Sequence, residues 1–238
     1  MILKSGRPHQ PISTRSRMRW ALRWTNARDG RGKFAPVVRA AWFATLCALA
    51  TSGPVAASTA GAETAPPLQS LPSLEVPPYM GTWYQVALFP NVFQRQCVSD
   101  TTATYRQLPD GTVEVANRCR TADGRLDEAI GQARPTGTLS GTRLAPAQLK
   151  VSFLPAWLRW MPVGWGAYWV IQLADDGRYA VISEPSRQYL WILSRQSRLA
   201  DADEVAIRAR LAQQGFSDLS KLQMHRHGIA PTPAPAKP

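Results

Sequence analysis

The chain has 238 residues, of which 45% are hydrophobic, and a formal net charge of +12 at pH 7. The positive charge is concentrated at one end: residues 1–57 carry ten Lys or Arg and one Asp, whereas residues 58–238 carry eighteen Lys or Arg and fifteen Asp or Glu. Because the larger part of the chain is close to neutral, the composition argues against a nucleic-acid partner for the folded domain.

The first 57 residues are typical of an export signal. Many basic residues precede an apolar segment, 40–50, which has about the length of a signal h-region. Thr51–Pro54 interrupts this segment, and Val55–Ala57 provides small residues for cleavage. The sequence therefore predicts that the protein is exported. The alternative is an uncleaved membrane anchor, because residues 40–62 contain no charge.

Lipid attachment at Cys47 is not expected. Cys47 lies inside the apolar segment, and Leu46 precedes it where a lipoprotein signal carries a small residue. Residues 58–78 are rich in Ala, Pro, Ser and Thr and predict a flexible linker, and residues 229–238 predict a disordered Pro/Ala tail. One domain remains, residues 79–228, which is long enough for a single core.

Eight short segments of this domain have the alternation typical of β-strands, and turn residues separate them. They are residues 82–89, 101–108, 112–119, 128–134, 149–153, 168–173, 179–183 and 189–194. A helix is predicted from the acidic cluster at 201–204 to Gly215, followed by a short strand at 221–225. Eight strands joined in sequence order predict an all-β, antiparallel up-and-down barrel with a C-terminal α-helix.

Trp83 near the start of the first strand and Arg195 at the end of the last large strand predict a structural contact. In a closed barrel these two positions meet at one end, where the guanidinium can lie over the indole face. The alternating pattern then adds a consequence: if Arg195 points inward, Leu193, Trp191 and Tyr189 point inward as well.

With Gly81, Trp83, Arg195, the eight strands and the trailing helix, residues 79–228 resemble the lipocalin family. The segments 102–105, 149–153 and 189–195 are similar in particular to bacterial outer-membrane lipocalins and the apolipoprotein D group. The resemblance implies a barrel that binds a fatty acid or lysophospholipid without a covalent step. It also implies a place in the bacterial envelope, in the periplasm or at the periphery of the outer membrane.

The resemblance further implies which side chains face the ligand. Tyr105, Asn117 and Trp169 stand at pocket positions of the apolipoprotein D-like pattern, and Arg120 is a looser candidate. Tyr189 and Trp191 join them from the alternation described above. The alternative for Trp191 is a side chain that fills the core, and the alternative for Asn117 is a side chain that satisfies backbone groups.

Cys97 and Cys119 flank the first hairpin, in which the numbers of facing residues sum to about 220, so the two lie near each other. In an exported domain this predicts a disulfide, with two free buried thiols as the alternative. A second feature is the apolar connection at 154–166, which carries Trp157, Trp160 and Trp165. It predicts contact with a membrane interface, a homodimer contact, or packing on its own barrel.

Nothing in the domain predicts an enzyme. The three histidines are His9, His225 and His227, so the strands of the barrel have no imidazole for a nucleophile or a histidine metal cluster. We expect no cofactor and no metal. Two alternatives stay open: a barrel enzyme that uses a carboxylate, for which Glu184 is the candidate, and a structural envelope protein with a filled barrel.

Overall fold

The computed structural model describes residues 66–228. The predicted leader at 1–57, the first part of the linker and the tail at 229–238 lie outside the described residues.

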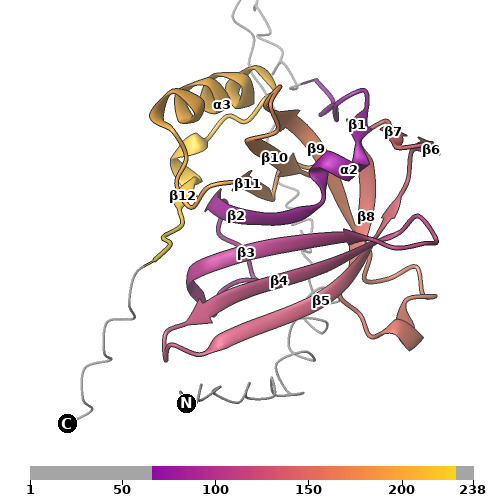
Figure 1. The fold of residues 1–238 in the computed structure, drawn as a ribbon. Helices are drawn as coiled ribbons and strands as arrows, with labels where there is room; N and C mark the ends of the chain where they lie inside the picture. The colour runs from indigo at the N-terminus through magenta and orange to yellow at the C-terminus, as the bar shows by residue number, and fades with distance from the viewer. Residues whose placement is uncertain (1–65, 229–238) are drawn as a thin grey trace, which may run out of the picture.

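The main sheet closes on itself as an antiparallel barrel (Figure 1). Neighbouring strands pair in sequence order, and the barrel closes where the last strand pairs with the first, from Trp191 opposite Leu88 to Ser194 opposite Tyr84. The predicted eight-stranded up-and-down barrel is confirmed. Its strands are β2 (Gly81–Leu88), β3 (Cys97–Gln107), β4 (Val113–Thr121), β5 (Leu126–Pro135), β8 (Gln148–Ser152), β9 (Gly166–Leu173), β10 (Tyr179–Ser183) and β11 (Leu190–Ser194).

The up-and-down order gives the barrel two different ends. Because consecutive strands run in opposite directions, the connections 89–96, 122–125, 153–165 and 184–189 lie at one end, which we call the mouth. The connections 108–112, 136–147 and 174–178 lie at the other end, which we call the base. The connection from β8 to β9 contains one short 3₁₀ turn, η2 (Ala156–Leu158).

The prediction of a flexible linker at 58–78 is corrected for its described part. This part contains β1 (Leu74–Glu75) and α2 (Val76–Tyr79), and β1 pairs with β7 (Arg143–Ala145), which in turn pairs with β6 (Thr138–Ser140). The physical reason is burial: Leu68, Leu74 and Val76 are all buried, although Pro and Ser surround them in the sequence. Residues 74–79 therefore cover the base of the barrel, whereas Leu68 packs on the outside of its wall.

The helix α3 (Asp201–Gln213) creates a second core outside the barrel. Ile207 and Leu211 are fully buried in a cluster with Val181 and Ile192, which face outward from β10 and β11. The intervening residues of the same strands, such as Ile182, belong to the interior cluster. Strands β9–β11 are therefore covered on both faces. The alternation predicted for all eight strands is for this reason absent from these three, whose sequences are almost continuously apolar.

The C-terminal segment returns to the barrel after α3. It passes through η3 (Leu219–Lys221) and forms β12 (Gln223–Met224), which pairs with the mouth half of β2. Beyond it, His225 Nε2 and Thr101 Oγ1 are 2.7 Å apart, and His227 Nε2 lies 2.9 Å from the carbonyl oxygen of Gln85. The two histidines thus contact the barrel wall.

The predicted disulfide is confirmed. Cys97 and Cys119 are bonded, with their Cα atoms 5.5 Å apart. The predicted register, in which the numbers of facing residues sum to about 220, holds near the turn of the hairpin, where Tyr105 faces Val115. Bulges near the mouth shift this register slightly, and Cys97 faces Thr121 there. The bond joins β3 to β4 at the mouth and excludes the alternative of two free thiols.

Candidate ligand-binding site in the barrel

The base of the barrel is closed by Arg195 and Trp83. The guanidinium carbon lies 3.7 Å from the centroid of the indole ring. Gly81, beside this guanidinium, has a φ of +88°, a backbone conformation that favours glycine. The guanidinium also donates hydrogen bonds to the carbonyl oxygens of Pro78 (2.6 Å), Met80 (2.8 Å) and Thr82 (2.9 Å).

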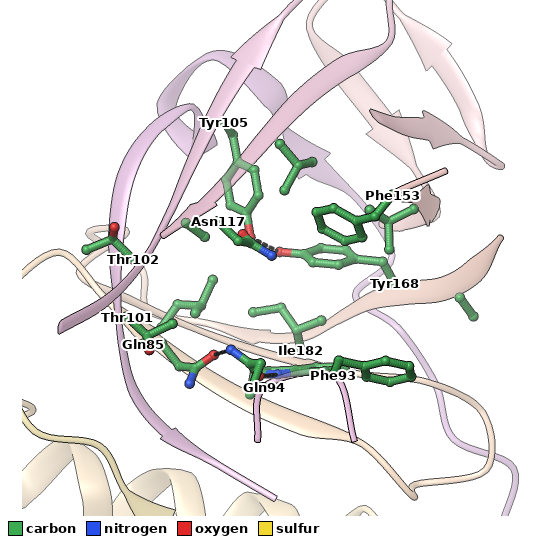
Figure 2. Close-up of a pocket in the computed structure, with 16 residues that line it drawn as sticks. Gln85, Phe93, Gln94, Thr101, Thr102, Tyr105, Asn117, Phe153, Tyr168 and Ile182 are labelled. Carbon is green, nitrogen blue, oxygen red and sulfur yellow. Dashed lines mark hydrogen bonds between the residues drawn. The ribbon is translucent and has the colours of Figure 1, made fainter. Parts of the chain in front are cut away.

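Between this base and the mouth lies a cavity of about 70 Å³ (Figure 2). Its wall is mostly apolar and comes from strands all around the barrel, including Ala103, Val115, Val151, Ile182 and Leu193, and from Phe153 just after β8. A smaller set of polar side chains also reaches the cavity: Gln85, Gln94, Thr101, Thr102 and Asn117. An apolar wall with a few polar groups is the usual composition of a site for a small amphipathic ligand.

The connection 89–96 covers the cavity at the mouth. Phe93 is buried there, with its ring centroid 5.3 Å from that of Tyr189, and Tyr189 stacks on Trp191 at 5.9 Å. Gln94 of the same connection lines the cavity. Phe93 and Gln94 thus form the part of the cavity wall that comes from the mouth connection.

A relay of amides connects this cover to the barrel wall. The indole Nε1 of Trp191 donates to Oε1 of Gln94 at 2.9 Å, and Nε2 of Gln94 donates to Oε1 of Gln85 at 2.7 Å. Because an indole N–H can only donate, it fixes the orientation of both amides. Nε2 of Gln85 is consequently left buried with no hydrogen-bond partner among residues 66–228. Such a donor favours an acceptor at this point of the wall.

Three tyrosines form the floor of the cavity. The hydroxyl of Tyr168 lies 2.8 Å from that of Tyr79 and 3.0 Å from that of Tyr105. Burial raises the pKa of Tyr105 to about 12 and raises the pKa values of Tyr79 and Tyr168 well above the ordinary value. All three phenols therefore stay neutral at physiological pH. Beneath them lies a second, almost wholly apolar cavity of about 30 Å³.

Several side chains that the sequence assigns to a ligand are found in or beside the cavity. Tyr105, Asn117 and Trp191 line it, and Tyr189 packs on the interior core next to Trp191. The side chain of Asn117 makes no hydrogen bond within the described part of the chain, which removes the support for its alternative role as a partner of backbone groups.

Trp169 and Arg120 do not line this cavity, and their assignment is corrected. Trp169 packs against the outer cluster beneath α3, because its neighbour Tyr168 is the residue of β9 that points inward. Arg120 follows the inward Cys119 and therefore points outward, where its Nε lies 3.2 Å from Oδ2 of Asp100. Both corrections are shifts of one residue along a strand, which exchange the two faces.

Four residues of the cavity are not predicted from the sequence: Gln85, Tyr168, Phe93 and Gln94. A signal existed for the first of them: Gln85 is two residues after the inward Trp83, so the same alternation places it in the interior. Tyr168 has no such signal, because β9 is apolar on both faces; that Tyr168 shares the inward face with the buried Val170 emerges only from the structure. Phe93 and Gln94 lie in a connection without regular structure, where no periodic pattern applies.

The apolar connection between β8 and β9 divides into two parts. The guanidinium carbon of Arg134 lies 4.4 Å from the ring centroid of Trp165, whose Nε1 donates to the carbonyl oxygen of Arg159 at 3.1 Å. Trp165 is thus held on the barrel wall. Trp157 and Trp160 are 72% and 77% exposed.

The groups considered for catalysis or metal binding have structural partners. Glu184 accepts hydrogen bonds from the backbone N–H groups of Ser186, Gln188 and Tyr189 and so shapes the connection between β10 and β11. Within residues 66–228 there is no group of three or more His, Cys, Asp or Glu side chains that could hold a metal ion. A search of the same residues finds no helix with the length and apolar character needed to span a membrane.

The closed barrel, its interior cavity and the base formed by Trp83 and Arg195 are features of one class of protein. The family model described as a lipocalin-like domain matches residues 74–227, and the chain belongs to the lipocalin family. Members of this family are generally binding and transport proteins.

Among its relatives is temperature-induced lipocalin-1 of Arabidopsis thaliana, which is 36% identical over 167 residues, 70% of this chain and 85% of the relative. Outer membrane lipoprotein Blc of Escherichia coli (strain K12) is 38% identical over 144 residues, 60% of this chain and 73% of the relative. Apolipoprotein D of Mus musculus is 26% identical over 189 residues, 76% of this chain and 90% of the relative.

Solved structures agree on the fold. Insecticyanin from the tobacco hornworm Manduca sexta has a TM-score of 0.50 at 18% identity and covers 67% of this chain and 84% of its own. The cockroach allergen Per a 4 also has a TM-score of 0.50 at 18% identity and covers 67% of this chain and 92% of its own.

Proposed function

We propose that this protein is a lipid-binding lipocalin of the bacterial envelope that carries or stores fatty acids or lysophospholipids in its barrel. The observation that carries the proposal is the apolar cavity inside a closed barrel, with polar groups gathered on its mouth side. The family of the chain and its similarity to Blc support it. Binding is an equilibrium without a covalent step, and we propose no catalytic activity.

The driving force is the transfer of an acyl chain from water to the apolar wall, about 25 cal/mol per Å² of buried surface. The buried N–H groups of Gln85 and the unpaired amide of Asn117 can bind the oxygen atoms of a carboxylate or phosphate headgroup. The cavity of about 70 Å³ is smaller than the roughly 300–1,000 Å³ of small-molecule sites. Entry of a full acyl chain therefore displaces Phe93 from the mouth.

For its location we propose the periplasm or the periphery of the outer membrane. The basic and apolar segments at 1–57 support export. Several relatives carry the name outer membrane lipoprotein Blc. In this chain Leu46 precedes Cys47, which argues against a lipid anchor at that cysteine.

We propose in addition that Trp157 and Trp160 contact a membrane interface. Both rings are largely exposed, and Arg159 lies between them in the sequence. Trp and Arg are both favoured at the boundary between lipid and water. A homodimer contact through the same two side chains is the alternative; it would appear as a concentration-dependent doubling of mass in light scattering and be lost on Trp157→Ala.

The proposal is tested by titrating the delipidated protein with palmitate and with lysophosphatidylethanolamine, and by native mass spectrometry of the protein as purified. We expect one lipid bound per chain. Trp191→Ala should weaken binding because Trp191 lines the cavity, whereas Trp169→Ala should leave it unchanged because Trp169 packs on the outer cluster. No bound lipid and no saturable titration would contradict the proposal.

A further inference from the structure

The cavity and the smaller cavity beneath it are separated by a shared wall. Tyr105, Val115 and Tyr168 line both, so one face of each residue looks toward the mouth and the other toward the base. The lower cavity is enclosed by residues of the base, including Leu74, Leu139 and Leu144. Without the shared wall, the two would form one longer apolar channel along the axis of the barrel.

The topology shows that this wall crosses the full width of the barrel. In the closed order of eight strands, β3 and β9 are four positions apart and are therefore on opposite sides. Tyr105 extends from β3 and Tyr168 from β9, and their hydroxyl oxygens meet at 3.0 Å across the lumen (Figure 2). Side chains that bond across the lumen from opposite strands obstruct its full width. A bond between side chains of adjacent strands would leave most of the width open.

A third tyrosine holds this bridge from the base. Tyr79 of α2 bonds to the hydroxyl of Tyr168 at 2.8 Å, and its ring lies nearly parallel to that of Tyr105, with centroids 5.7 Å apart. Tyr168 is the member common to both hydrogen bonds. Since the three phenols remain neutral, no charge repulsion opens the bridge at physiological pH.

We propose that Tyr168, held by Tyr79 and Tyr105, sets the length of acyl chain that the barrel accepts. The inference rests on the proposed function and adds to it a residue that determines specificity. Polar groups lie on the mouth side and apolar surface leads to the tyrosines, so the headgroup stays near the mouth and the end of the acyl chain stops at Tyr168. The lower cavity stays closed to ligand.

The test compares a series of saturated fatty acids, from octanoate to stearate, in competition for one bound fluorescent fatty acid. In the wild-type protein, affinity should rise with each methylene and then level off when the chain reaches Tyr168. In Tyr168→Ala the rise should continue through further methylenes, by about fourfold for each one, which corresponds to roughly 0.8 kcal/mol per buried CH₂. Tyr168→Leu provides a second, less disruptive variant with the same expected direction.

Two control variants make the result specific. Tyr84→Leu removes a tyrosine that packs on the outer cluster and should leave the chain-length profile unchanged. Leu139→Ala enlarges the lower cavity and should change the profile only when combined with Tyr168→Ala. Identical profiles in the wild type and both Tyr168 variants would overturn the inference while leaving lipid binding intact. Absence of binding by every fatty acid to every protein would overturn both.

Discussion

The guanidinium of Arg195 makes two kinds of contact. Its flat face lies over the indole ring of Trp83, and the N–H groups along its edge donate hydrogen bonds to three backbone carbonyl oxygens. The carbonyl groups belong to the segment that enters β2, so a single side chain fixes the last strand of the barrel to the first. Burial lowers the pKa of Arg195, which nevertheless remains a cation throughout the physiological range. Its role in the structure is therefore to close the base.

Arg195→Ala should lower the free energy of unfolding by about 2–4 kcal/mol, because the stacked contact is lost and the carbonyl oxygens lose a charged donor. Urea denaturation measures the change. Arg125→Ala is the matched control, since Arg125 is an exposed side chain paired with the exposed Asp123 at the mouth, and it should leave the midpoint unchanged. Equal effects of the two substitutions would remove Arg195 from its role.

The orientation of the helix α3 depends on the spacing of its apolar residues along the chain rather than on how many apolar residues it contains. Ile207 and Leu211 are four residues apart, share one face and are fully buried, whereas the apolar Val205 lies on another face and is 70% exposed. The paired Arg178 and Asp203 add a bidentate contact between the helix and the turn after β9. The helix is thus held on the outer faces of β10 and β11.

Ile207→Ala should destabilise the protein by about 2–4 kcal/mol, since it removes a buried side chain and leaves a cavity under α3. Val205→Ala changes the same helix by a similar number of atoms at an exposed position and should have an effect below about 0.5 kcal/mol. Thermal or urea unfolding of both variants distinguishes them. A large loss for Val205→Ala would contradict the orientation of the helix.

The C-terminal segment after β12 should respond to pH. Burial and the neighbouring His227 lower the pKa of His225, against smaller opposite effects of a backbone hydrogen bond at Ser99 and of Asp100. A histidine whose pKa is lower in the folded state contributes its full stability above its unfolded pKa and loses it as the pH falls. We therefore expect the stability to decrease on acidification below about pH 6.5.

The measurement is the free energy of unfolding between pH 8 and pH 5. His225→Gln should remove part of this acid dependence. An acid dependence equal to that of the wild type in His225→Gln would contradict the assignment.

As a whole, the molecule is a barrel with an apolar lumen, closed by tyrosines and an arginine at its base and covered by one connection at its mouth. The disulfide lies at the mouth and joins β3 to β4, next to the end of the covering connection. Its cross-link spans a sequence separation of 22 residues. The cover is thus anchored at one end by a covalent bond.

Replacing Cys97 and Cys119 together by alanine should reduce the free energy of unfolding by about 3 kcal/mol, because the unfolded chain regains the freedom of the closed loop. Guanidinium denaturation of the oxidised protein and the double variant measures it. The barrel should still form, since its strands close independently of the bond. An unchanged midpoint would contradict the expectation.

The sequence predicts the barrel well because strand alternation and turn residues are local signals. The contact between Trp83 and Arg195 also follows, since both lie at strand ends that closure brings together. For Trp169 and Arg120 the resemblance implies the wrong face of the strand, because a shift of one residue reverses the direction of a side chain. The tyrosine bridge could not be predicted, because it joins strands on opposite sides of the lumen and depends on the closed shape.

The decisive measurement is an NMR experiment on the deuterated protein with protonated methyl groups, saturated with protonated palmitate. Nuclear Overhauser effects between the acyl chain and the methyl groups of Val115 and Ile182, which line the cavity, are the expected result. Val205 on the exposed face of α3 is the internal control. Effects confined to Val205 and other exposed methyl groups, with none to Val115 or Ile182, would contradict a lipid held inside the barrel.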